Sequence, residues 1–126
     1  MNRILLWAAV LAAFTAALHT IMGTAEITGP LLRSHLPPQL SLLLYACWHL
    51  VSGTLIASSA ALFMAAREPE RHRSMAQFVA WLWLCFGLVF IGVAVGGSGV
   101  AMLLELPQWS LLLPVGVFGL WGIRRK

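Results

Sequence analysis

Charged side chains are scarce in this sequence. Only 10% of its 126 residues are charged, acidic residues number four, and 60% of the chain is hydrophobic. A water-soluble domain usually has about a quarter of its residues charged. The shortage excludes an ordinary soluble core, and the mean hydropathy of +0.88 is typical of a chain that lies in a lipid bilayer.

Cysteine and low-complexity sequence are scarce as well. The two cysteines, Cys47 and Cys85, lie within apolar segments and show no CxxC or Cys/His spacing, so they form no zinc motif. We interpret both as small packing residues. No internal repeat or long polar linker divides the chain, and we therefore predict a single domain over residues 1–126.

Long apolar segments are what the chain does contain. A helix needs about 18 or more apolar residues to cross the hydrocarbon layer, and such segments recur along the sequence. We predict an all-α membrane protein, an antiparallel bundle of four transmembrane helices with spans at about 4–27, 40–66, 75–95 and 107–123. The fourth span starts either at Pro107 or near Val100, with Pro107 as a kink.

The first span also resembles a signal peptide, with a base, an apolar run and small residues in that order. Only Arg3 precedes the apolar run, which continues past the small residues to Gly23. We therefore expect this segment to be retained as a helix.

The basic residues are distributed unevenly between the two sides of the predicted bundle. Arg33 falls on one side, and the other side receives the remaining bases, Arg3, Arg67, Arg71, Arg73, Arg124, Arg125 and Lys126. By the positive-inside rule, both termini lie in the cytoplasm, and we predict a multi-pass protein of the plasma (inner) membrane. The basic residues behind the net charge of +4 then fix the topology and contact anionic lipids. The partner we expect is the lipid bilayer, and we expect no nucleic acid.

Small residues spaced four apart occur in the first three spans, and three glycines spaced three apart occur in the fourth. These sets are Ala9, Ala13 and Ala17; Gly53, Ala57 and Ala61; Gly92 and Gly96; and Gly116, Gly119 and Gly122. Small side chains let helix backbones approach closely where lipid provides no hydrophobic drive. The stripes predict tight helix packing, either within the chain or against a second copy or another membrane protein.

Polar side chains gather in the outer half of the predicted bundle. With a rise of about 1.5 Å per residue, His19 lies about 8 Å inside the outer boundary and Glu26 lies at that boundary. His49 enters from the next helix at a similar depth. We expect an outward-facing pocket for a small ligand or ion, lined by His19, Glu26, Tyr45, Trp48, His49, Glu105, Gln108 and Trp109.

Several kinds of chemistry fit such a set. His19 and His49 could ligate a transition-metal ion or serve as the two axial ligands of haem b. In a structural or assembly subunit, the histidines would instead bond a backbone carbonyl, Tyr45 or Ser52. A proton-coupled transporter and a lipid-modifying enzyme, with His19 or Glu26 as the acid-base group, are further alternatives. We expect a binding or structural protein and not an enzyme.

Overall fold

The computed structural model describes residues 1–125, and this part of the chain contains helices and no strand. Its elements, in chain order, are α1 (Arg3–Gly23), the π-helix η1 (Thr24–Thr28), α2 (Gly29–Leu32), α3 (Pro38–Arg67), α4 (Arg73–Ser98), α5 (Met102–Glu105) and α6 (Trp109–Arg124).

Three of the helical segments are long and apolar enough to cross a membrane. They are Arg3–Leu32, Pro38–Arg67 and Arg73–Ser98, whereas α6 is a shorter apolar helix. Many large apolar side chains on these helices are exposed, including Leu50 at 70% and Phe78 at 69%. An all-helical chain with these features is suited to a bilayer and would be poorly soluble in water.

The helix bounds differ from the expected spans at two places. The first span was predicted to end near residue 27, but α1 continues through η1 and α2 to Leu32. Near the alternative start of the fourth span at Val100, the chain forms the short helix α5, but the helix is not continuous into α6, because the backbone leaves the helical region at Leu106, with φ −117° and ψ 70°. The last helix therefore begins at Trp109, two residues after Pro107.

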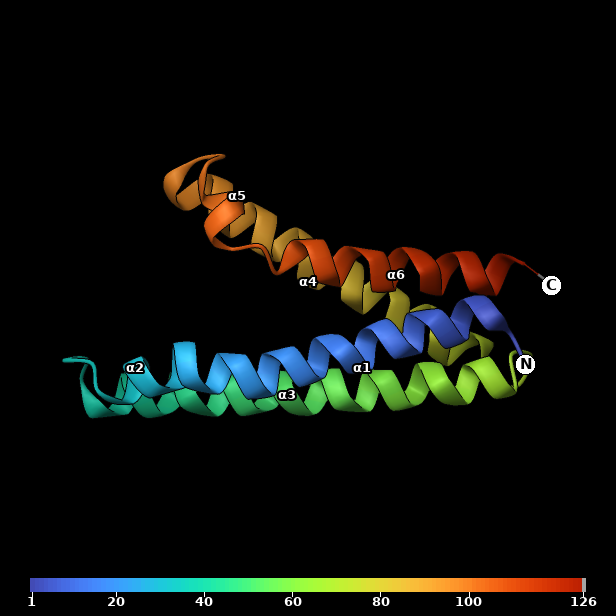
Figure 1. Ribbon diagram of the computed structural model, residues 1–126, viewed down its shortest axis with the longest axis horizontal. Helices are drawn as coiled ribbons and strands as arrows, with labels where there is room; N and C mark the ends of the chain where they lie inside the picture. Colours follow the sequence, from blue (N-terminus) through green and yellow to red (C-terminus); the bar gives the residue numbers. More distant parts are fainter. Residues whose placement is uncertain (126) are drawn as a thin grey trace.

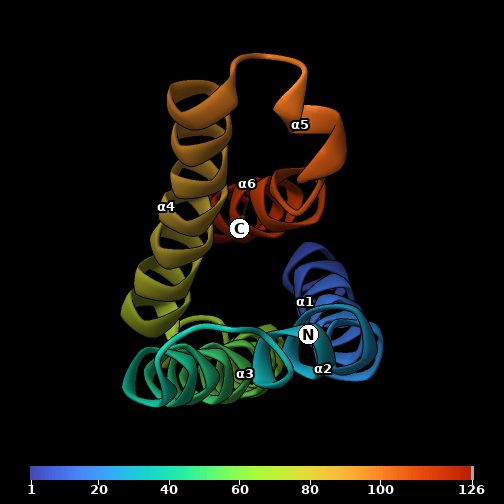
Figure 2. The same cartoon turned by 90° about the vertical axis from the view of Figure 1, so that its left-hand side faces the viewer.

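The helices form two antiparallel pairs (Figure 1). Helix α1 lies along α3, and α6 lies along α4. Both termini of the described chain lie at one end of the molecule, where the pairs meet. Toward the opposite end, which carries α2 and α5, the pairs diverge, and Figure 2 shows them separated when the molecule is seen from that end.

Glycines of α6 allow this helix to lie close to both α4 and α1. A Cβ at Gly119 would lie 2.7 Å from the Ala80 Cβ of α4, and one at Gly122 would lie 2.9 Å from the Leu5 Cγ of α1. These glycines belong to the half of α6 nearest the chain ends. Gly119 closes the α4–α6 pair, and Gly122 joins that pair to α1 at this end, because a glycine has no side chain to keep the helices apart.

Asn2 connects three helices at the same end. Its side-chain oxygen accepts hydrogen bonds from the N–H groups of Ile4 and Leu5, which caps α1. Its side-chain amide donates to the Gly122 carbonyl of α6 at 2.8 Å, and its backbone N–H donates to the Ala66 carbonyl of α3 at 2.7 Å. No sequence motif had indicated this role for Asn2.

The other predicted stripes of small residues are not packed in the same way. A Cβ at Gly53, Gly92 or Gly96 would meet no heavy atom of residues 1–125 within 4 Å. Ala13 and Ala17 are exposed, and only Ala9 of that stripe is buried. Within the described chain, the glycine stripe of α6 is the predicted stripe that packs closely, and Gly53, Gly92 and Gly96 face outward.

Candidate functional site

Helices α1 and α3 bring together most of the predicted site residues. The antiparallel register is set at one end by the bond from the Asn2 N–H to the Ala66 carbonyl. At the other end, the Ser41 hydroxyl donates to the Leu31 carbonyl at 3.3 Å. Between these two bonds, the middle of α3 faces the C-terminal third of α1.

His19 and Trp48 form the centre of the cluster. Their rings are stacked, with centroids 3.9 Å apart and planes inclined by 17°. Gly23, one turn after His19, provides the space for the indole, because a Cβ there would collide with the Trp48 ring. The imidazole is thus held between two helices by a flat aromatic surface, and Gly23 is a site residue that the analysis of the sequence did not identify.

His49 does not meet His19. It follows Trp48 on α3 and so lies within about 1.5 Å of the same height, as the helix arithmetic predicted. Its side chain is exposed, and its ring makes an edge contact with Tyr45, one turn earlier, at a centroid distance of 4.5 Å. We refer below to His19, Tyr45, Trp48 and His49 as the imidazole cluster.

One polar atom of the imidazole cluster has no partner. The His19 Nε2 is buried and makes no hydrogen bond with any group of residues 1–125. Ser52, which had been considered as its partner, donates instead to the Trp48 carbonyl at 2.9 Å. A buried polar atom without a hydrogen bond is unfavourable by about 1–3 kcal/mol, which makes this nitrogen the most distinctive feature of the site.

The neighbouring hydroxyl groups of α1 and η1 are satisfied by their own helix. Thr20 donates to the Ala16 carbonyl at 2.9 Å, and Thr28 donates to the Thr24 carbonyl at 2.8 Å. Glu26 lies among these threonines on η1, and its side chain is exposed. Single π-helical turns inside α-helices occur frequently at functional sites, and Glu26 lies in the middle of this one.

Glu105, Gln108 and Trp109 lie apart from the imidazole cluster. They belong to α5 and to the start of α6, and both views place α5 away from α1 and α3 (Figures 1 and 2). The expectation that all eight predicted residues line one pocket is therefore not met. The cause is the divergence of the helix pairs, which Gly122 and Asn2 join at the other end.

These three residues have local contacts of their own. The Trp109 indole N–H donates to the Leu103 carbonyl at 3.0 Å and so fastens α6 to α5. Trp109 also lines an apolar groove of about 350 Å³ on the surface of α6. The Gln108 Oε1 is buried without a hydrogen bond to any described group, and Glu105 is exposed.

The geometry provides no assembled metal site in residues 1–125, where no group of three or more His, Cys, Asp or Glu side chains is arranged to hold an ion. The His19 ring stacks on Trp48, and His49 is exposed. Metal or haem ligation by this pair stays a prediction without geometric support.

Comparisons of the chain with protein-family models, with curated proteins and with solved structures found no match.

Proposed function

We propose that the chain is a four-span protein of the plasma membrane with both termini in the cytoplasm, and that its imidazole cluster, together with Glu26, binds a small ligand from the outer side. The observation that carries the ligand site is the buried His19 Nε2 without a hydrogen-bond partner, next to a stacked indole.

The proposed topology is supported by the position of the bases. Arg3, Arg67, Arg73 and Arg124 begin or end α1, α3, α4 and α6 at the end of the molecule where both termini lie. Helix α6 rises about 24 Å, near the lower limit for a span, and it packs along α4 and α1 as a bundle member would.

The chemistry of the imidazole cluster favours a ligand with both a flat or apolar part and a hydrogen-bonding group. Trp48 and Tyr45 offer aromatic surfaces, and the His19 Nε2 offers one donor or acceptor according to its tautomer. Glu26 and His49 are exposed nearby and could contact the polar part of such a ligand. Binding sites commonly combine apolar walls with a few polar groups in this way.

The alternatives of transport and lipid chemistry have less support from the contacts. A proton path would need free polar groups in the inner half, where the sequence offers mainly Ser58, Ser59 and Gln77. Ser58 donates to the Thr54 carbonyl at 2.6 Å and Ser59 to the Ile56 carbonyl at 2.8 Å, so both hydroxyl protons are bound within α3.

A structural or assembly subunit is the second candidate function. The observation that favours it is the outward-facing set Gly53, Gly92 and Gly96, whose backbones are open to close approach by another helix. A homo-oligomer or a membrane-protein partner would then cover these faces.

Native mass spectrometry of the protein, purified from its own membranes in mild detergent, tests both candidates. We expect the wild type to carry a bound small molecule that His19→Leu loses, because this variant removes the imidazole and with it the unpartnered Nε2. His35→Leu is the matched control, since His35 lies exposed in the connection between α2 and α3.

Three results would decide against the ligand site or change its nature. Retention of the same molecule by His19→Leu would remove His19 from the site. A wild-type mass without any added small molecule, but with a second protein chain, would favour the assembly subunit. A Soret band or stoichiometric metal in the same sample, lost in His19→Leu and in His49→Leu, would identify haem or a metal ion as the ligand.

A further inference from the structure

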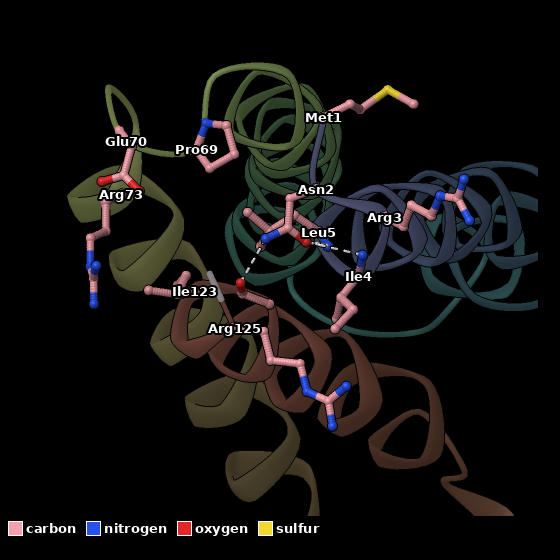
Figure 3. A pocket seen from close by; sticks show the side chains of 11 residues that line it. Met1, Asn2, Arg3, Ile4, Leu5, Pro69, Glu70, Arg73, Ile123 and Arg125 are labelled. Atoms are coloured by element: carbon pink, nitrogen blue, oxygen red, sulfur yellow. Dashed lines mark hydrogen bonds between the residues drawn. The ribbon is translucent and has the colours of Figure 1, made fainter.

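A second pocket lies at the end of the molecule where the helix pairs meet. It has a volume of about 430 Å³ and is lined by residues from the starts of α1 and α4, the end of α6 and the connection between α3 and α4. Figure 3 shows these side chains around Asn2, the residue that connects the three helices. The imidazole cluster contributes no residue to this pocket.

The pocket combines an apolar floor with basic groups. Leu5, Ile4 and Ile123 contribute apolar surface, whereas Arg3, Arg73 and Arg125 contribute positive charge from three different helical segments. The three arginine side chains are exposed, and in Figure 3 they extend outward on different sides of Asn2. Glu70 is the one acidic residue in the lining, so positive charge predominates.

The local hydrogen bonds and ion pairs leave this charge available. In the described part of the chain, the ion pair found is between Arg71 and Glu68, and neither residue lines the pocket. The Asn2 side chain is occupied by its bonds to Ile4, Leu5 and Gly122. The guanidinium group of Arg125 lies over the Trp121 ring, 4.7 Å from the centroid, a contact that leaves its charge unneutralised.

We propose that this pocket binds the phosphate group of an anionic phospholipid. Guanidinium groups bind phosphate oxygens, and basic pockets between helix ends are suited to lipid headgroups. The three exposed arginine side chains extend outward in Figure 3, and binding one phosphate would require them to turn toward it. The apolar floor beneath the arginines suits the glycerol and upper acyl carbons, which inorganic phosphate lacks. This inference depends on the proposed position of the chain in the membrane. It does not depend on whether the imidazole cluster binds a ligand.

The joint contribution of the three pocket arginines can be separated from general attraction to an acidic surface. A basic residue near an anionic surface contributes about fivefold in affinity, so three in one site contribute about 100-fold. The test variant is Arg3→Gln/Arg73→Gln/Arg125→Gln. The matched control, Arg67→Gln/Arg71→Gln/Arg124→Gln, removes the same charge from the same end, at positions outside the pocket lining.

The experiment measures binding of short-chain phosphatidylglycerol to the purified protein in neutral detergent by native mass spectrometry. Phosphatidylcholine and inorganic phosphate are the comparison ligands. We expect the test variant to lose about 100-fold in affinity for phosphatidylglycerol and the control to lose at most about threefold. Equal losses in the two variants, or equal binding of phosphatidylcholine, would overturn the proposal.

Two acidic residues between α3 and α4, Glu68 and Glu70, allow the reverse test, in which a negative charge is removed. Glu70→Gln removes the negative charge from the pocket and should strengthen phosphatidylglycerol binding about fivefold, whereas Glu68→Gln, two residues earlier, should leave it unchanged. If inorganic phosphate binds as tightly as the lipid and responds to the same variants, a soluble phosphate compound is the ligand and the lipid assignment is wrong.

Discussion

Replacing Trp83 by alanine is expected to lower the free energy of unfolding by about 3–5 kcal/mol. Trp83 is 0% exposed and is the largest fully buried side chain in the described part of the chain. It lies in the core with Leu5, Leu62 and Val115, which come from three other helices. Removing its ring would leave a cavity that these helices cannot all close at once.

Trp81→Ala is the matched control for this variant. Trp81 lies two residues earlier on α4 but is 56% exposed, so its loss should change stability by about 0.5 kcal/mol. The measurement is equilibrium unfolding of the purified protein in detergent. Equal destabilisation by the two alanine variants would contradict the described core.

Trp83→Phe separates packing from hydrogen bonding. The Trp83 indole nitrogen is buried without a hydrogen bond to any described group, so phenylalanine loses ring volume but no bond. We expect a loss below about 1.5 kcal/mol. A loss as large as that of Trp83→Ala would show that the indole N–H has a partner that this account lacks.

Replacing Gly116 by leucine should destabilise the protein by about 1–3 kcal/mol or more, through overpacking. A Cβ at this position would lie 2.6 Å from the Leu84 Cγ and 2.8 Å from the Ala80 carbonyl oxygen. The Leu84 side chain can change rotamer, but the Ala80 carbonyl belongs to the α4 backbone and moves only with the helix. Helices α4 and α6 would therefore have to separate.

The control for Gly116→Leu is Gly92→Leu on α4. A Cβ at Gly92 meets no described atom within 4 Å, and leucine has the better helix propensity by roughly 0.5–1 kcal/mol. We expect unchanged or slightly raised thermal stability in detergent for this variant. A destabilised Gly92→Leu protein would indicate a neighbour at that face, as the assembly-subunit alternative requires.

Helix positions were predictable because hydropathy over a long window is a strong signal. The second and third helices, Pro38–Arg67 and Arg73–Ser98, exceed their predicted spans by only one to three residues at each end. The end of the first was missed because Gly29 and Pro30 indicated a break, whereas the π-helical turn at Thr24–Thr28 carries the helix into α2. Such a turn has no clear sequence signature.

The positions of the site residues along the helix axes were predictable from the sequence. The directions in which their side chains point around those axes were not. His49 does lie at the level of His19, since the rise per residue is constant. Which residue of α3 faces α1 depends on the rotation of two packed helices, and a step of one residue turns the direction by about 100°. The indole of Trp48 takes the inward position, and His49 is left exposed.

The separation of Glu105, Gln108 and Trp109 from the imidazole cluster depends on the crossing of whole helix pairs. Gly116 and Gly119 fit α6 against α4, and only Gly122 touches the other pair, at Leu5 of α1. The sequence marked these glycines as small residues without indicating their partners. For the same reason the basic pocket was unforeseen. Arg3, Arg73 and Arg125 are distant in sequence and come together only where the helix ends meet.

The most direct test of the account is chemical labelling of single cysteines in intact cells, after Cys47 and Cys85 have been replaced by serine. A membrane-impermeant maleimide should label Glu26→Cys and Glu105→Cys from outside. It should reach Glu68→Cys and Arg124→Cys only after the membrane is permeabilised. Labelling of Glu68→Cys or Arg124→Cys in intact cells, or protection of Glu26→Cys, would contradict a four-span protein whose imidazole cluster opens to the outer side.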